Sequence, residues 1–292
     1  MALATQITID DVTPYNIESH IEQIKQLYAD EGAVILPGFF TADSVFRQYV
    51  ADLREITQHL AYEARVDINP QLDLDEQITR LAAVRRDIVG RIYDIGTRPG
   101  KLLSGMLLKL HPVLINLVKT LLPQSALIAT PALSDTLHVF PPGGDSYRFN
   151  LPIHQDYPYL LQSPNQVTFW ISFSPRHADV GGMTLWRGSH KLGICKQKRD
   201  AQGHLECVVD EAELAKHPEV RCEADFGDMV IFHSNILHRS ERNYTQDKTR
   251  IVQLFRFSDL RDEESQRIAW QSADIHPRAK RFEDIYPGAM VV

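Results

Sequence analysis

The sequence contains few cysteines, no long apolar run and no dense cluster of basic residues. Its three cysteines, Cys195, Cys207 and Cys222, are odd in number and have no Cys-x-x-Cys spacing, so neither a disulfide framework nor a zinc knuckle is expected. The most apolar stretch, residues 102–122, is interrupted by lysines, an asparagine and a His-Pro pair, which excludes a membrane-spanning helix. The net charge of −7 argues against nucleic acid as a partner, because phosphate binding requires a basic face.

The N-terminus lacks a basic segment followed by an apolar one. We therefore expect no secretory signal, and the cysteine usage favours a cytoplasmic protein. The hydrophobic content of 43% and the charged content of 24% are typical of a globular chain that buries a large core. Because the sequence shows no repeat, low-complexity segment or linker, we predict one domain over residues 1–292.

The two halves of the chain have different patterns. Up to about residue 130, apolar residues recur at three- and four-residue steps, which predicts helices. One spans residues 17–28, and another begins after Thr41 as its N-cap. A short apolar strand, residues 33–36, lies between them. The later half has short β-type runs separated by proline and glycine, which predicts a sandwich or barrel. The predicted strands are 133–140, 150–157, 167–173, 183–187, 205–209, 228–233 and 249–257.

A candidate metal-binding pattern lies in the predicted strand 150–157, where His154 and Asp156 are two residues apart. Alternate side chains of an extended segment point to the same face, so the two could bind one ion. A neutral imidazole and a carboxylate suit a divalent transition metal. With 12 histidines and 23 aspartates, about one His-x-Asp pair is expected by chance. A second pair, His177-Ala-Asp179, lies in a predicted loop, where the same-face argument fails.

Two later histidines could supply a third ligand. His233 ends a predicted strand, and His238 follows a short turn. Arg250 begins an otherwise apolar strand, and its planar guanidinium suits a carboxylate, although a partner such as Asp247 or a C-terminal acid would also explain it. Two histidines, a carboxylate and a nearby carboxylate-binding arginine match the arrangement of non-haem Fe(II) oxygenases.

These residues belong to a set of motifs that resembles the phytanoyl-CoA dioxygenase family of Fe(II)/2-oxoglutarate oxygenases. The motifs are Tyr28-Ala-Asp-Glu-Gly-Ala-Val-Ile-Leu-Pro-Gly-Phe-Phe40, Pro141-Pro142, Leu151-Pro-Ile-His-Gln-Asp156, Phe169-Trp170, Gly181-Gly-Met-Thr-Leu-Trp-Arg-Gly-Ser-His190, Gly227-Asp-Met-Val-Ile-Phe-His233, His238-Arg-Ser240 and Arg250. The resemblance implies a mostly β fold with bracing α-helices. Its core would be a double-stranded β-helix (jelly-roll, cupin-like) over about 131–258, between a helical part at about 1–130 and an extension at 259–292.

The resemblance also implies roles for individual residues. The expected iron ligands are His154, Asp156 and His238, while His233 matches a position where relatives often have a histidine that is not a ligand. From the residues alone, His233 remains the alternative third ligand. The expected 2-oxoglutarate-binding residues are Arg250, Ser240, Gln155, Trp170 and Thr136. A carboxylate at position 156 implies oxygenation, since related halogenases have alanine or glycine there. The chain departs from the family pattern at Arg239, where small residues are common, and in an interval from His238 to Arg250 that is one residue longer.

We therefore expect an enzyme that uses Fe(II), 2-oxoglutarate and dioxygen to hydroxylate a C–H bond of a small-molecule or natural-product substrate, releasing succinate and CO2. Two alternatives remain open. One is a barrel protein that binds metal without catalysis, and the other is a zinc hydrolase with the same three ligands. No nucleic-acid or membrane partner is expected.

Substrate contacts are predicted in less detail. The charged, helical segment at residues 62–100 and the loop at 191–204 are candidate lid or selectivity elements. His138 shares the face of Thr136 on a predicted strand and could reach a substrate. Arg148 and Arg256 could bind an acidic one.

Overall fold

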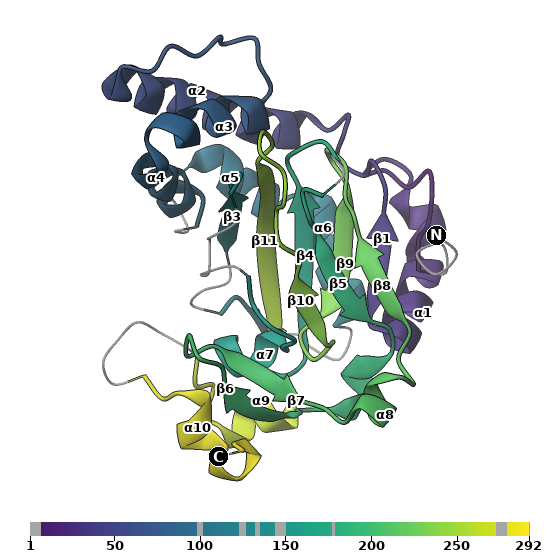
Figure 1. Cartoon of the computed structure of the whole chain (residues 1–292). Coiled ribbons are helices and arrows are strands. Elements are labelled where there is room, and N and C mark those ends of the chain that lie inside the picture. Colours follow the sequence, from purple (N-terminus) through teal and green to yellow (C-terminus); the bar gives the residue numbers. More distant parts are fainter. Residues whose placement is uncertain are drawn as a thin grey trace.

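The computed structural model describes residues 7–97, 102–122, 127–131, 135–143, 150–176, 179–272 and 279–291. The predicted change from helices to strands is confirmed within these ranges (Figure 1). The helices are α1 (Ile21–Glu31), α2 (Ser44–Ala64), α3 (Leu74–Val84), α4 (Arg86–Thr97), α5 (Leu103–Lys109), α6 (Pro112–Leu121), α7 (Asp156–Leu160), α8 (Glu211–Leu214), α9 (Glu263–Arg267) and α10 (Phe282–Ile285), with the 3-10 turns η2 (Ile17–His20), η3 (Ser189–Leu192) and η4 (Pro287–Ala289).

The strands form antiparallel sheets. The largest sheet has the order β1-β9-β4-β11-β2, with β3 also paired to β11, and a second sheet has the order β10-β5-β8. A separate hairpin joins β6 to β7. The strands are β1 (Ala33–Leu36), β2 (Ile128–Ala129), β3 (Thr136–Phe140), β4 (Gln166–Ser172), β5 (Met183–Trp186), β6 (Lys196–Arg199), β7 (Leu205–Val208), β8 (Glu219–Cys222), β9 (Met229–His233), β10 (His238–Ser240) and β11 (Arg250–Asp259).

The large sheet separates two apolar cores, because successive side chains of a strand point to opposite faces. On β11, Ile251 and Phe255 pack into the core shared with helices α1 to α6. Val252 and Leu254 pack into the core shared with the β10-β5-β8 sheet. We call this second side the inner face. It carries the even-numbered residues of β3, β4 and β11.

The helices cover the opposite face and one end of the large sheet. Figure 1 shows α2 to α5 gathered beside β3 and β11, while α1 lies beside β1. Helix α4 contacts β3. Among the described residues, no helix is both long and apolar enough to cross a membrane.

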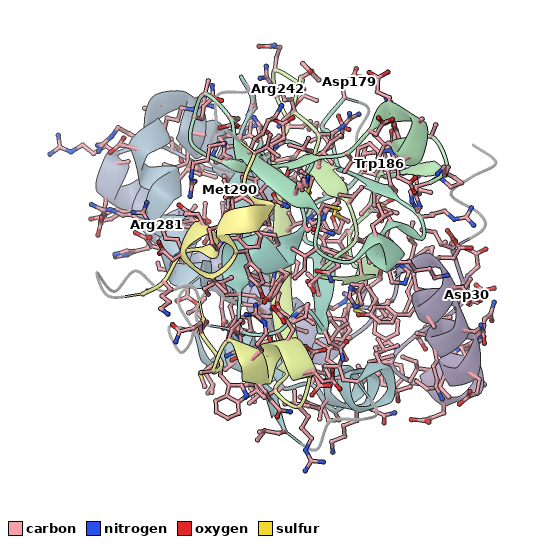
Figure 2. All side chains as sticks on the ribbon, turned by 90° about the horizontal axis from the view of Figure 1, so that it is seen from below. Asp30, Asp179, Trp186, Arg242, Arg281 and Met290 are labelled. Atoms are coloured by element: carbon pink, nitrogen blue, oxygen red, sulfur yellow. The ribbon has the colours of Figure 1, made fainter. Side chains whose placement is uncertain are left out.

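The C-terminal segment packs against the β6–β7 hairpin rather than continuing the large sheet. Val291 N donates to Gln197 O at 2.8 Å, and Met290 forms a β-bridge with Gln197. Figure 2 shows this segment from below, with Arg281 and Met290 labelled. The loop predicted at residues 191–204 was wrong in part, because this segment contains the end of η3 and the strand β6.

The predicted N-cap of α2 was also wrong. Asp43, not Thr41, caps the helix, accepting a hydrogen bond from Phe46 N at 2.9 Å. Thr41 instead donates its hydroxyl to Phe226 O, 185 residues along the chain. A polar residue near the start of a helix can bond to such a distant partner instead of capping the helix, and the sequence pattern alone does not reveal this.

Candidate metal centre

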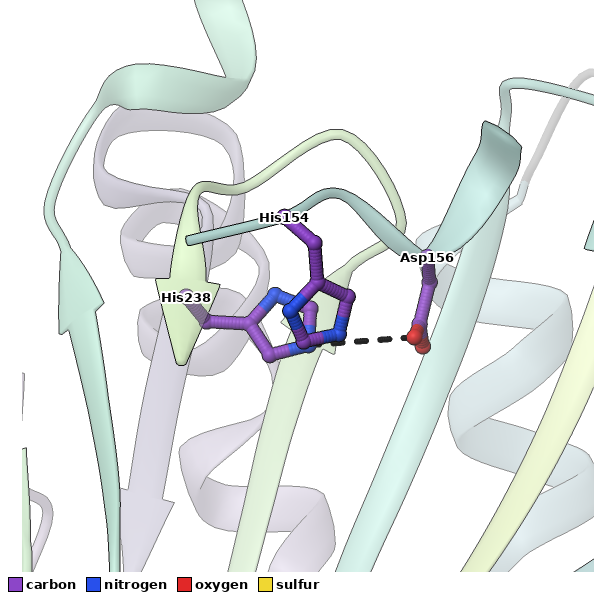
Figure 3. Close-up of side chains that lie close together, drawn as sticks. All are labelled: His154, Asp156 and His238. Carbon is purple, nitrogen blue, oxygen red and sulfur yellow. Dashed lines mark ion pairs between the residues drawn. The ribbon is translucent and has the colours of Figure 1, made fainter. Parts of the chain in front are cut away.

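Three predicted ligands lie together in the interior. One ligand atom each from His154, Asp156 and His238 lies within 4.8 Å of the others, and all three side chains are buried (Figure 3). His238 Nε2 lies 3.7 Å from Asp156 Oδ1. The two imidazole centroids are 4.1 Å apart. Two nitrogen donors and one oxygen donor therefore converge on one small region.

Two backbone features bring these residues together, an isolated β-bridge and the start of helix α7. His154 and His238 form an antiparallel bridge, in which each amide donates to the other's carbonyl at 2.9 and 3.0 Å. Gln155 is extended, and Asp156 then begins α7 while its amide donates to Ser234 O at 2.8 Å. The strand predicted over residues 150–157 was wrong, but the local extension at Gln155 still places His154 and Asp156 on the same side.

Hydrogen bonds determine the tautomer of both histidines. His154 Nδ1 lies 2.8 Å from Pro152 O, and His238 Nδ1 lies 3.0 Å from Ile236 O. Because a carbonyl oxygen only accepts, each Nδ1 carries the proton and each Nε2 keeps its lone pair. Burial, and then the neighbouring His238, lowers the pKa of His154 to about 3. Burial also lowers the pKa of His238. Both rings are therefore neutral, the state in which an imidazole can bind a metal ion.

Asp156 is held as a carboxylate by buried donors. Its Oδ2 accepts hydrogen bonds from Thr168 Oγ1 at 3.1 Å and from Arg256 Nε at 2.8 Å. Burial by itself raises the pKa of Asp156, but Arg256 and the two histidines outweigh it and hold that pKa well below its usual range. The ion pair between Asp156 and Arg256 is almost completely shielded from solvent.

Arg250 lies at the start of β11 on the inner face. Its Nη1 donates to Gly182 O at 2.7 Å and to Glu241 O at 3.0 Å, and its guanidinium lies 3.8 Å from the Phe140 ring centroid. Its Nε is buried without a hydrogen-bond partner, and among the described residues no carboxylate forms an ion pair with it. Burial lowers the pKa of Arg250 to about 9. The alternative explanation for Arg250, an ion pair with Asp247 or a C-terminal acid, is therefore not found among the described residues.

The remaining predicted residues fall into two groups. Thr136, His138 and Trp170 lie on the inner face, and Thr136 Oγ1 accepts a hydrogen bond from Arg256 Nη1 at 3.2 Å. Burial, and then Arg256 and Arg250, lowers the pKa of His138 to about 3. These side chains therefore occupy the same side of the sheet as Asp156 and Arg250.

Gln155 and Ser240 belong to the second group. The Gln155 side chain donates to Gly193 O and Asn235 O, both at 2.7 Å, and accepts from Cys195 N at 3.0 Å. Its amide thus holds two backbone segments near the centre, at residues 193–195 and at Asn235. Ser240 pairs with Met183 across β10 and β5, two residues beyond His238. Predicted positions Arg148 and His177 lie outside the described residues.

His233 is not part of the cluster. It is packed between Tyr28 and His190, with ring centroids 5.9 and 5.3 Å away, and its Nδ1 accepts from Asn235 N at 3.1 Å. Burial, followed by His190, lowers its pKa to about 3. His238, not His233, lies beside the other two residues because the two histidines are in different sheets. His238 begins β10, which pairs with β5, whereas His233 ends β9 in the large sheet.

The buried, neutral state of His233 predicts a pH dependence of stability. Its folded pKa is depressed below the unfolded value of about 6.5. The unfolded state therefore binds more protons, and the stability contribution, complete above that value, is lost as the pH falls toward 3. In urea unfolding we expect His233→Asn to reduce the slope of unfolding free energy against pH by about half of 1.4 kcal/mol per pH unit near pH 6.5, and by nearly all of it near pH 5. Equal slopes for variant and wild type would contradict this.

The sequence pattern did not reveal the partner of Asp156. Arg256 was named only as a residue that could bind an acidic substrate, yet it forms an ion pair with Asp156. Thr168 carried no prediction of its own. A signal was present, because Thr168 and Arg256 lie on the inner face of their strands by parity, but only the strand register places them side by side.

Family membership is decided by a match to the profile described as "Phytanoyl-CoA dioxygenase (PhyH)", which spans residues 28–252. The chain belongs to the phytanoyl-CoA dioxygenase family. The resemblance predicted from the motifs is thus confirmed, and the matched range contains the three converging ligands and Arg250.

Among curated proteins, this member of the phytanoyl-CoA dioxygenase family is similar to the 1-deoxypentalenic acid 11-beta-hydroxylases. The Streptomyces arenae protein is 29% identical over 121 residues, covering 39% of this chain and 43% of that protein. The Streptomyces exfoliatus protein is 27% identical over 117 residues, covering 38% and 41%. The chain therefore spans less than half the length of the curated relatives that it matches.

Solved structures show the same fold. The epimerase SnoN, in complex with Fe3+, alpha ketoglutarate and nogalamycin RO, matches with a TM-score of 0.55 and 15% identity, covering 83% of this chain and 84% of that one. EctD from S. alaskensis, with 2-oxoglutarate and 5-hydroxyectoine, matches with a TM-score of 0.51 and 17% identity, covering 86% and 79%. At such identities these likenesses show the fold alone.

Proposed function

We propose that this protein is an Fe(II)- and 2-oxoglutarate-dependent dioxygenase that hydroxylates a C–H bond of a small-molecule substrate. The observation that carries the proposal is the pairing of a buried two-histidine, one-carboxylate cluster with a buried arginine that has no carboxylate partner among the described residues. Family membership supports the same reaction class. We further propose that the two sheets form one jelly-roll domain, the double-stranded β-helix of such oxygenases.

The donor set fits ferrous iron. His154 and His238 each keep a lone pair on Nε2, and Asp156 supplies an anionic oxygen. Imidazole nitrogen with carboxylate oxygen is the ligand set of non-haem Fe(II) oxygenases, in which open coordination positions remain. When bound, the iron would supply the oxidation in which dioxygen converts 2-oxoglutarate to succinate and CO2 and hydroxylates the substrate. The protein's own residues orient the reactants and exclude water.

Arg250 is suited to bind the far carboxylate of 2-oxoglutarate. Its charge is buried, its Nε lacks a partner, and two backbone carbonyls hold its Nη1 in place. A planar guanidinium pairs well with a carboxylate. Ser240, Trp170, Thr136 and Gln155 complete the proposed cosubstrate pocket, with Gln155 acting through the backbone segments that it holds.

A carboxylate at position 156 favours hydroxylation over halogenation, since its side chain fills the place that chloride would need. A small-molecule substrate is supported by the names of the curated relatives, which are hydroxylases of 1-deoxypentalenic acid. The inner-face core around Trp170 and Leu254 is apolar, as small-molecule sites commonly are.

The direct test is succinate formation by purified protein. We expect 2-oxoglutarate to be converted to succinate only when Fe(II) and oxygen are both present, and chelation of the metal to abolish the conversion. Replacement of Fe(II) by Zn(II) is the matched control and should give no succinate, because zinc has no redox chemistry with which to use dioxygen. Metal binding without any 2-oxoglutarate consumption across a broad panel of substrates would contradict the proposal and favour a non-catalytic binding protein.

A further inference from the structure

We propose that Thr168 and Arg256 form a carboxylate clamp that holds Asp156 Oδ2 and reserves Oδ1 for the metal. The proposal rests on the proposed function, because it concerns how the iron ligand is presented. It assigns Arg256 a positioning role, in place of the substrate-binding role that the sequence suggested.

The two oxygens of Asp156 have different surroundings. Oδ2 accepts from Thr168 Oγ1 at 3.1 Å and from Arg256 Nε at 2.8 Å. Oδ1 lies 3.7 Å from His238 Nε2, and its contact with Arg256 Nη2 is longer, at 3.4 Å. The two strong donors thus act on Oδ2, whereas Oδ1 is the oxygen beside His238 Nε2. Hydrogen-bond donors of this kind commonly orient a metal-binding carboxylate.

The strand register explains why both donors reach one oxygen. Thr168 of β4 lies directly opposite Arg256 of β11, and both side chains point to the inner face. Thr136 lies opposite Leu254 on the other flank of β11, and its hydroxyl accepts from Arg256 Nη1 at 3.2 Å. Thr136 of β3 therefore holds the guanidinium from one side, while Thr168 of β4 holds the carboxylate of Asp156 from the other. A side chain on a central strand of a sheet has a rigid support.

Arg256 is poorly placed to capture an acidic substrate. Its Nε and Nη2 contact Asp156 and its Nη1 contacts Thr136, so each nitrogen already has a partner. A substrate anion would have to displace a buried carboxylate, leaving a buried charge unpaired. Arg250 differs, since its Nε has no hydrogen-bond partner among the residues that the structure describes. The two inner-face arginines of β11 are therefore distinguished by their contacts.

The clamp has a chemical consequence for the metal. A carboxylate that is free to rotate can offer both oxygens to one ion. With Oδ2 held by two donors, Asp156 offers one, which leaves a further coordination position for 2-oxoglutarate or dioxygen. Loss of either donor should therefore change the binding and the spectrum of the metal, not only turnover.

The test measures metal binding without catalysis. Mn(II) affinity and the visible absorption of the Co(II)-loaded protein are compared, in the absence of 2-oxoglutarate, for wild type, Arg256→Met, Arg256→Lys, Thr168→Val and Thr168→Ser. We expect Arg256→Met to weaken Mn(II) binding by about 10–100-fold and Thr168→Val by about 10-fold. The Co(II) bands should shift in both. Thr168→Ser keeps the hydroxyl and should retain wild-type affinity and spectrum, while Arg256→Lys should fall between wild type and Arg256→Met.

Arg187 provides a control, because it also forms an ion pair, with Glu31 at 2.8 Å, although this pair is less buried. Arg187→Met should leave Mn(II) affinity within about twofold of wild type, because it removes an arginine–carboxylate pair that does not touch Asp156. Circular dichroism and thermal melting confirm folding. If Arg256→Met does not fold, the Thr168→Val and Thr168→Ser pair decides the question.

The outcomes separate this inference from the proposed function. The clamp alone would be overturned if folded Arg256→Met showed wild-type Mn(II) affinity and an unchanged Co(II) spectrum. If Arg256→Met does not fold, the same result in Thr168→Val would overturn it. Equal weakening in Thr168→Val and Thr168→Ser would also overturn it, because the hydroxyl would then be irrelevant. A wild-type protein that binds neither ion would overturn the proposed function.

Discussion

Asp156→Ala should abolish 2-oxoglutarate turnover. The substitution removes the one anionic donor of the cluster and leaves two neutral imidazoles. The loss should exceed the about 10–100-fold that removal of an outer-shell partner typically causes. Succinate formation at saturating Fe(II) measures it. Normal turnover in Asp156→Ala would contradict the assignment of Asp156 as an iron ligand.

A double variant separates catalysis from stability. In Asp156→Ala the Arg256 guanidinium stays buried without its carboxylate, which costs about 3–5 kcal/mol for a pair of this kind. Asp156→Ala combined with Arg256→Met removes both charges, so urea unfolding should show recovered stability while turnover stays absent. Recovered turnover would show that the loss in the single variant came from unfolding.

Arg250→Met should weaken 2-oxoglutarate binding while leaving metal binding unchanged. Truncating one partner of a buried charge pair costs about 2–5 kcal/mol, so the KM for 2-oxoglutarate should rise at least about 30-fold. Mn(II) affinity without 2-oxoglutarate should remain at the wild-type value, because Arg250 contacts Gly182, Glu241 and Phe140 rather than the three ligands.

Arg250→Lys is the informative companion variant. It keeps the charge but loses the planar fork, so it should recover part of the affinity for 2-oxoglutarate. Arg250→Met also removes two hydrogen bonds to backbone carbonyls. Thermal melting curves measure how much stability is lost with them. A wild-type KM in folded Arg250→Met would show that the far carboxylate of 2-oxoglutarate binds elsewhere.

The predictable part of the molecule rests on short-range patterns. Alternating and three- to four-residue periodicity located the helices of the first half and the strands β4, β5, β9 and β11 closely, because each element buries one face. The spacing of His154 and Asp156 and the order of the motifs also predicted that His154, Asp156 and His238 converge.

Other features depend on residues far apart in the chain. Asp43 replaced Thr41 as the N-cap because Thr41 bonds to Phe226. The predicted strand around His154 became a single bridge and a helix start because His238 and Ser234 supply its hydrogen bonds. Hydrogen bonds to such distant residues compete with local ones, and the sequence pattern does not show which of them form.

The sequence by itself determined the family, the ligand chemistry and the inner-face parity of Thr168, Arg250 and Arg256. Only the tertiary structure decided that Arg256 pairs with Asp156. It also decided that Arg250 Nε has no hydrogen-bond partner among the described residues. Asp156 and Arg256 are 100 residues apart. The two arginines have the same parity on one strand, so only the register of the neighbouring strands and the start of α7 give them different partners.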